Sequence, residues 1–135
     1  MTTPANHLRA VLEFELDDTF VILPLSASPV IPTGKHGVMP YRSTVNPLIG
    51  LLGNGNIRNN TFMVHVISPL ANMVTAQAEL NDALDAVLDA LETDQSLEWT
   101  EAVFERYNDV LWCYTISLTI ASSHTPDVPA DLEEA

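Results

Sequence analysis

The residues best suited to chemistry are four histidines and one cysteine, and they are far apart in the chain. They are His7, His36, His65, His124 and Cys113. No two of them have the close spacing of a zinc-binding or metallohydrolase motif, in which ligands recur within a few residues. A single cysteine also cannot form an internal disulfide, which is typical of a reducing compartment. We therefore expect no metal site, no cofactor, and a packed rather than nucleophilic cysteine.

Acidic side chains form the second group that could do chemistry. Four of them recur at spacings of three and four residues, at Asp82, Asp85, Asp89 and Glu92. This spacing places them on one face of a helix. Clustered carboxylates can bind cations or act as acid–base pairs, but a solvated helix face has the same pattern. We expect a solvated face. Because no Gly-x-Ser-x-Gly motif flanks any serine either, the sequence predicts a protein without enzymatic activity.

The acidic face belongs to the strongest helix signal in the chain, at about residues 69–92. Large apolar residues recur on the opposite side, at Leu80, Leu84, Val87, Leu88 and Leu91. Ser68 is a suitable N-cap and Pro69 a suitable first helical residue, because the first turn of a helix needs no N–H from proline. The sequence thus predicts a long amphipathic helix with its leucines in the core.

A second helix and four or five strands account for most of the rest. The N-terminal helix is predicted at His7–Leu16 with Asn6 as its N-cap, and Ser26–Pro40 is predicted as a loop. Strands are predicted at Phe20–Leu25, Tyr41–Val45, Thr61–Ser68, 98–106 and Leu111–Ala121. Segment 98–106 could instead be a short helix. Runs of strands without strict βα alternation favour an α+β fold, with a mostly antiparallel sheet and both helices on one face.

Alternation along the strands predicts which side chains point into the core. Thr61–Ser68 is apolar on both faces, which indicates a central strand. In the last strand we expect Trp112, Tyr114, Ile116, Leu118 and Ile120 to point inward, and Cys113, Thr115, Ser117 and Thr119 to point outward. In segment 98–106, Trp99, Glu101, Val103 and Glu105 are expected to alternate with Thr100, Ala102, Phe104 and Arg106.

Two segments fit no regular element. Asn46–Asn60 mixes glycines and asparagines with four aliphatic residues, Leu48, Ile49, Leu51 and Leu52. The segment could fold over the core of its own domain, or it could be an arm that becomes ordered against a neighbour. Exposed aliphatic side chains are a liability on a monomer, which slightly favours the neighbour. Residues 1–121 then form a single domain, and residues 122–135 are predicted to be an acidic, disordered tail.

The charge of the chain limits its partners. The net charge is −13. Residues 1–58 hold four acids and four bases, whereas residues 59–135 hold fourteen acids and Arg106 alone. Such a surface repels phosphate backbones, so we expect no specific nucleic-acid binding. Neither a membrane span of about 20 apolar residues nor a secretory signal is expected.

The order of elements resembles the tail terminator, or tail completion, proteins of long-tailed bacteriophages. The resemblance covers roughly residues 6–121 and is carried by Thr61–Pro69, the alanine-rich helix to Leu91, Glu98–Ala102 and Trp112–Ile120. It implies a hexameric ring that caps the tail tube, stops its polymerisation and joins it to the head. The implied partners are the tail tube protein and head–tail connector proteins. The implied location is the head-proximal end of the virion tail, after synthesis in the host cytoplasm, with DNA passing through the lumen.

A closed ring of identical subunits needs two different patches that complement one another. Three of the five bases lie within residues 35–58, and the acids are dense within residues 79–105. We therefore expect Leu48, Ile49, Leu51 and Leu52, with Arg42 or Arg58, to contact the neighbour's acidic helix or hairpin. The alternatives are a connector or stopper protein of the head–tail joint, a small ligand- or partner-binding domain without catalysis, and an acidic protein that binds a basic partner or mimics nucleic acid.

Overall fold

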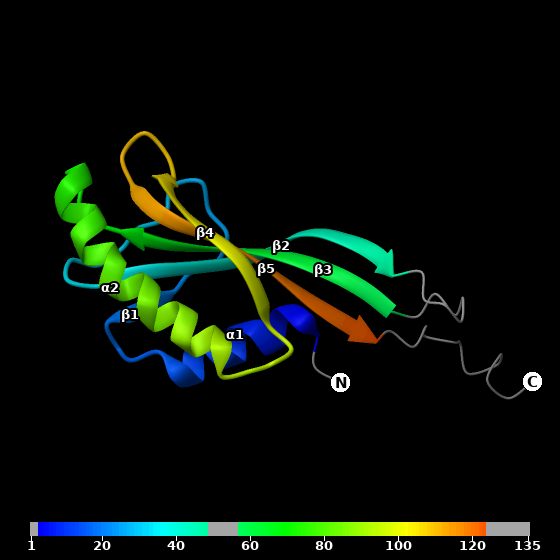
Figure 1. The fold of residues 1–135 in the computed structure, drawn as a ribbon. Helices are drawn as coiled ribbons and strands as arrows, with labels where there is room; N and C mark the ends of the chain where they lie inside the picture. Colours follow the sequence, from blue (N-terminus) through cyan, green and yellow to red (C-terminus); the bar gives the residue numbers. More distant parts are fainter. Residues whose placement is uncertain (1–2, 49–56, 124–135) are drawn as a thin grey trace, which may run out of the picture.

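The chain folds into a five-strand sheet covered by two helices, as a computed structural model of residues 3–48 and 57–123 shows (Figure 1). The elements are α1 (Pro4–Glu15), β1 (Phe20–Ile22), β2 (His36–Leu48), β3 (Ile57–Ser68), α2 (Met73–Glu92), β4 (Glu98–Arg106) and β5 (Trp112–Ser123). The strand order is β1-β2-β3-β5-β4. Only β1 and β2 are parallel, and the other neighbours are antiparallel. The predicted α+β class is confirmed.

The main core lies between the sheet and the two helices. Its buried side chains come from α1 (Leu8, Leu12), from α2 and the loop after it (Leu80, Ala83, Val87, Leu91, Leu97), and from the strands (Val38, Phe62, Val64, Val66, Ile116, Leu118, Ile120). β3 pairs with β2 on one side and β5 on the other, so it is central as predicted. Neither α1 nor α2 is long and apolar enough to cross a membrane.

The predicted faces of the long helix are observed. Leu80, Val87 and Leu91 are buried, while Leu84 and Leu88 are half-buried against the same core. The four acidic residues of the opposite face are exposed. Burying each large aliphatic side chain stabilises the fold by about 1.5–3 kcal/mol, so this stripe is a main contribution to stability.

Both helices begin at residues other than those predicted. Asn72 is the N-cap of α2, and its Oδ1 accepts a hydrogen bond from the backbone N–H of Thr75 at 3.1 Å. Ser68 cannot take this role because it still pairs with Trp112 in the sheet. α1 begins earlier than predicted: Thr3 accepts from the N–H of Asn6, so Asn6 is a helical residue and not the cap. The prolines explain part of this shift, since Pro4 suits the first turn.

The β2–β3 pair extends into the segment predicted as an irregular loop. Asn46 pairs with Asn59, and Leu48 pairs with Ile57. The glycine-rich loop predicted over residues 46–60 is therefore too long at both ends, and residues 49–56 lie outside the described part. β2 also begins at His36, within the predicted loop. Ser122 and Ser123 complete β5, so the predicted tail cannot begin at residue 122, and residues 124–135 are not described.

Segment 98–106 is a strand, and a β-bulge changes its alternation. Trp99 lies opposite Leu118, and Glu101 lies opposite Ser117, so Thr100 is an extra residue. One extra residue moves the following side chains to the other face. Trp99 therefore packs on the main core together with Ala102 and Phe104, and not on the face of Glu101.

The second face of the sheet is also partly buried. The loop between β1 and β2 crosses it, where Leu23 and Ile31 pack on buried Met39, Ile67 and Cys113. Cys113 and Thr115, predicted to point outward, do lie on this face but are buried.

Gly37 permits the close approach of this loop. A Cβ atom on Gly37 would lie 2.8 Å from Leu23 Cδ1 and 3.0 Å from Ile31 Cγ1.

The free edge of β2 opposes pairing with a further strand. β1 pairs with only the first three residues of β2. The carbonyl of Val38 accepts from Leu23 on this edge, so by alternation the nitrogen of Pro40 also faces outward. The bulge between residues 42 and 44 shifts the alternation by one, which turns the nitrogen of Pro47 outward too. Proline has no N–H to donate, and this is a common protection of edge strands.

Candidate functional site

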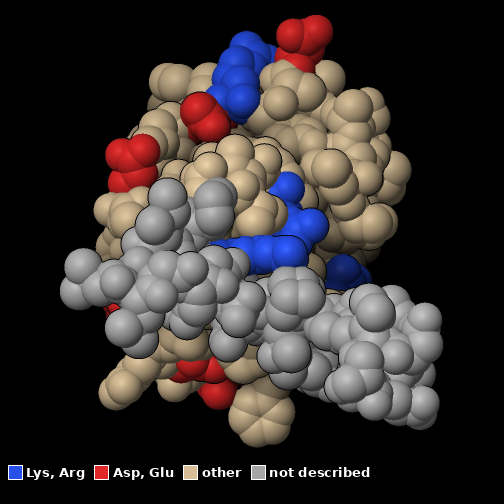
Figure 2. All heavy atoms as spheres, turned by 90° about the vertical axis from the view of Figure 1, so that its right-hand side faces the viewer, with Lys and Arg blue, Asp and Glu red and all other residues tan. Residues whose placement is uncertain are grey.

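Three strands extend beyond the helices and form a projecting end of the molecule. The ends of β2 and β5 and the start of β3 run past α1 (Figure 1). Arg42 lies opposite Phe62 in the ladder, so both side chains are on the helix-bearing face of the sheet. Arg58 precedes Phe62 by four residues on β3 and shares this face. We call these two residues the arginine pair. Figure 2 looks onto this end and shows basic atoms exposed near its middle.

The arginine pair differs from the other three bases of the chain. Arg9 binds Glu13 at 3.0 Å, Lys35 donates to the carbonyl of Asp18 at 2.9 Å, and Arg106 lies over the Trp112 ring. Arg42 and Arg58 are exposed, and no acidic partner is found for either among residues 3–48 and 57–123. Within the described residues, these two guanidinium groups are therefore candidates to bind an anionic group of another molecule.

The acidic face of α2 is the second surface that the sequence singles out. Asp82, Asp85 and Asp89 are exposed and form no ion pair within the described chain, and Glu92 accepts a hydrogen bond from Trp99 Nε1 at 3.1 Å. Two apolar side chains are exposed at the start of the same helix, Met73 at 49% and Val74 at 70%. The acids with these two apolar side chains beside them make this surface a candidate for a contact with another protein.

The predicted interface residues are only partly placed by the structure. Arg42 and Arg58 lie on one face, as stated above, and Leu48 is the last residue of β2. Ile49, Leu51 and Leu52 lie outside the described residues. The arginines and the acidic face of α2 belong to different surfaces. The sequence predicted the strand that carries Arg42 but placed Arg58 in an irregular segment, whereas Arg58 lies on β3.

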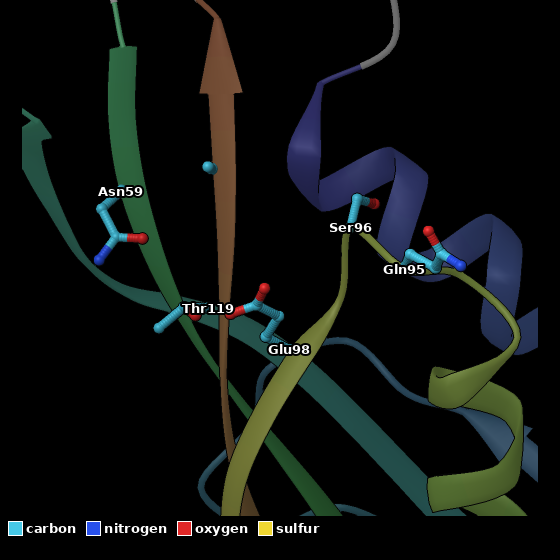
Figure 3. Close-up of a pocket in the computed structure, with 6 residues that line it drawn as sticks. Asn59, Gln95, Ser96, Glu98 and Thr119 are labelled. Carbon is cyan, nitrogen blue, oxygen red and sulfur yellow. The ribbon is translucent and has the colours of Figure 1, made fainter. Parts of the chain in front are cut away.

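A small hollow lies where β4 begins and β5 continues without it (Figure 3). It has a volume of about 170 Å³ and is lined by Asn59, Gln95, Ser96, Glu98, Thr119 and Ala121. Sites for small molecules usually enclose about 300–1,000 Å³ and are mostly apolar. The hollow is therefore too small and too polar for a ligand pocket.

The histidines are held by separate partners. His7 Nε2 lies 2.6 Å from Asp94 Oδ2 and links α1 to the loop after α2. Hydrogen bonds from Ser96 hold the pKa of the Asp94 carboxyl below its ordinary value. His36 Nδ1 lies 2.9 Å from Glu79 Oε1, although not in the direction of a hydrogen bond. His124 is outside the described residues.

His65 is the centre of a polar cluster on the second face of the sheet. Its Nε2 is 3.2 Å from the Tyr41 hydroxyl, and its Nδ1 is 3.0 Å from Thr115 Oγ1. Thr115 in turn donates to Glu105, and Cys113 Sγ lies 3.9 Å from His65 Nδ1. The sequence analysis did not identify the neighbours of His65. They are far apart in the chain, and only the strand register brings them together.

Burial determines how this cluster titrates. Desolvation lowers the pKa of His65, while the Glu105 carboxylate acts in the opposite direction. Desolvation also raises the pKa of Cys113 to about 11, so the free thiol is protonated at neutral pH. A thiol in this state is a poor nucleophile, which supports the expectation of a packed cysteine.

The lowered pKa of His65 predicts a loss of stability on acidification. The unfolded chain binds a proton at this residue at higher pH than the folded chain does. The stability is therefore fully present above about pH 6.5 and falls as the pH drops from there toward the folded pKa. Each pKa unit corresponds to about 1.4 kcal/mol. We expect His65→Gln to flatten the dependence of unfolding free energy on pH between about 5 and 7, measured by urea denaturation. His7→Gln should leave the His65 contribution in place, and parallel curves for wild type and His65→Gln would contradict the assignment.

Comparison with known proteins identifies no related family or protein. No protein-family model and no curated protein matches the chain. The order of elements, the surface charges and the geometry of this chain are therefore the basis for a proposed function.

Proposed function

We propose that this protein is a non-enzymatic virion assembly protein, a phage tail terminator that forms a ring on the tail tube, stops its polymerisation and joins it to the head. One observation carries the proposal. The arginine pair has no acidic partner in the described chain, and the same chain presents an acidic helix face with no basic partner. The resemblance in the order of elements, given above, supplies the tail terminator as the family.

The two charged surfaces suit a head-to-tail contact. When one copy places its arginine pair on the acidic face of the next, that second copy still has its own arginine pair free. Such a contact repeats with a constant rotation, and it closes into a ring when the rotation allows. The hexamer implied by the resemblance is a ring of this type. A two-fold dimer would instead need one patch that complements itself.

Charge alone would not hold the ring together. An exposed ion pair contributes only about 0–1 kcal/mol, so charges set the register while apolar contacts supply affinity. The acidic helix offers Met73 and Val74, and the projecting strands offer Val45, which is 39% exposed. The aliphatic residues of segment 49–56 are proposed to add to this contact. We therefore expect only modest weakening of assembly at raised salt.

Charge reversal tests the contact directly. Arg42→Glu with Arg58→Glu should give monomers by light scattering coupled to size-exclusion chromatography, because like charges would then face each other. Asp85→Lys with Asp89→Lys should do the same from the other side. Both variants should keep the wild-type circular dichroism, because all four side chains are exposed.

Mixing the two variants provides the sharper result. Each subunit of one variant can contact only subunits of the other, so equal amounts should restore a ring in which the two alternate, with an even number of subunits. Glu15→Lys with Asp18→Lys changes the net charge by the same amount at exposed positions outside α2, so it is the control for altered total charge. A wild-type chain that stays monomeric at high concentration and on purified tail tubes would overturn the ring. So would unimpaired assembly of both reversed variants.

A connector or stopper protein of the head–tail joint is the second candidate, because it would form a ring by the same contact. The two functions differ in their effect on the tube. A terminator added to purified, polymerising tail tube protein should stop elongation, whereas a connector should leave the length distribution in electron micrographs unchanged.

A further inference from the structure

Three side chains of different metal-binding chemistry converge on the second face of the sheet. They are His65 on β3, Cys113 on β5 and Glu105 on β4, and their donor atoms all lie within 4.8 Å of one another. Glu105 pairs directly with Cys113 in the ladder, and His65 pairs with Thr115, two residues further along β5. The ladder thus places the three donors in adjacent positions on neighbouring strands.

We propose that His65 Nδ1, Cys113 Sγ and a Glu105 carboxylate oxygen form a binding site for a divalent zinc-like ion. In tetrahedral zinc sites, bond lengths of about 2.0–2.3 Å place an imidazole nitrogen and a thiolate sulfur roughly 3.6 Å apart. The observed separation of Nδ1 and Sγ is 3.9 Å. Rotamer adjustments of a few tenths of an ångström would bring these two donors to the required spacing. Three protein ligands would leave a fourth position for water.

Hydrogen bonds around His65 can support either protonation of the ring. Without metal, Thr115 donates to Glu105, so its oxygen accepts from Nδ1–H and the Tyr41 hydroxyl donates to Nε2. With metal on Nδ1, the proton resides on Nε2 and is donated to the Tyr41 oxygen. Tyr41 therefore holds the ring orientation in both states, as the outer partners of metal-bound histidines commonly do.

The charges of the site balance those of a divalent cation. A thiolate and a carboxylate supply two negative charges, and the imidazole is neutral, so the loaded site would carry no net charge. Cys113 must release its proton to solvent when the ion binds, because the thiolate is the ligand. Glu105 is exposed on the edge strand, which gives the ion a route to the two buried donors. A thiolate and an imidazole also favour zinc or cobalt over magnesium or calcium.

Cobalt is the most direct probe of this site. Untagged, reduced, full-length protein should bind Co²⁺ in a ratio of one per chain, with a sulfur-to-cobalt charge-transfer band. Zn²⁺ should remove the band by displacement, and Mg²⁺ should not. Because the thiol must lose its proton, the apparent affinity should rise with pH between about 6 and 8. Absence of the band from folded protein would overturn the proposal.

Variants assign the donors. Cys113→Ala should abolish the band, and His65→Gln should weaken binding at least tenfold. Glu105 is exposed, so Glu105→Gln should preserve the fold while it weakens metal binding. This variant still tests the site if a substitution at buried Cys113 or His65 unfolds the protein. His36→Gln is the matched control and should bind as wild type does. A band that survives in Cys113→Ala, or equal affinity in Glu105→Gln, would contradict the site. Arg42→Glu with Arg58→Glu should bind cobalt normally, so failure of the ring leaves this test unaffected.

Discussion

Replacing Val87 by aspartate should unfold the domain or destabilise it by more than about 4 kcal/mol, whereas Asp85→Leu should leave it folded. Val87 is 0% exposed and lies in the main core between α2 and the sheet. An aspartate there would lose its hydration without gaining a partner, and this is among the most damaging single changes. Asp85 is exposed on the opposite face of the same helix, two residues away. Thermal and urea denaturation of the two variants measure the difference.

Graded effects should be seen between these two extremes. Leu84 and Leu88 are half-buried, so an aspartate at either position can reach solvent and should be less harmful than at Val87. Asp85→Leu should have the highest unfolding free energy of the four variants. Leu84→Asp and Leu88→Asp should be intermediate, and Val87→Asp should have the lowest. Equal stability of Val87→Asp and Asp85→Leu would show that the face of α2 is wrongly assigned.

The second large effect is expected at Phe62, the aromatic side chain at the centre of the sheet. Phe62 is 1% exposed on β3 and lies between its ladder partners Arg42 and Leu118. Phe62→Ala should destabilise the fold by about 3–5 kcal/mol, because it removes a buried ring and leaves a cavity. Phe14→Ala is the matched control, since Phe14 on α1 is 86% exposed and should change stability by less than about 0.5 kcal/mol.

Urea denaturation followed by tryptophan fluorescence measures both phenylalanine variants. Trp99 and Trp112 pack against the main core and report its loss. A small effect of Phe62→Ala would mean that the sheet is not packed at this position as described. A large effect of Phe14→Ala would show that this exposed ring is covered by another copy of the chain or by residues that the structure does not describe.

The faces of the regular elements could be predicted from the sequence, because they follow from local periodicity. The leucine stripe of α2 and the inward positions of β5 needed only spacings of three, four and two residues. The helix starts were less accessible. Ser68 and Asn72 are both good caps, and only the pairing of Ser68 with Trp112 decides between them. The residues near Ser68 in the sequence do not indicate that Trp112 will be its partner.

The polar cluster could not be predicted because its residues meet through register alone. His65 and Cys113 are 48 residues apart in the chain, yet His65 Nδ1 and Cys113 Sγ lie only 3.9 Å apart in the fold. Cys113 and Thr115 alternate with core residues, which suggested an outward position. The sequence held no signal for a loop that would cover them. The bulge at Thr100 could not be predicted either, because the alternation of side chains along residues 98–106 shows no interruption there.

The arrangement of the surface charges could be predicted from the sequence only in part. The split between a nearly neutral first half and an acidic second half is visible in the sequence, and it correctly identified two oppositely charged patches. The common face of Arg42 and Arg58 follows from the strand register, in which Arg42 lies opposite Phe62 and Arg58 precedes Phe62 by four residues, and local sequence does not give this register. The contact of these patches with another subunit stays a prediction.

The two outward-facing prolines of β2 have a consequence for how copies of the protein can associate. A chain that assembles with its own copies, as proposed here, must do so without joining them edge to edge into fibres. A strand laid along the free edge of β2 would find no donor at Pro40 or Pro47, so an open-ended stack of sheets would be interrupted at each copy. If the chain forms the proposed ring, this edge would leave its self-assembly to side-chain contacts rather than to strand pairing along β2.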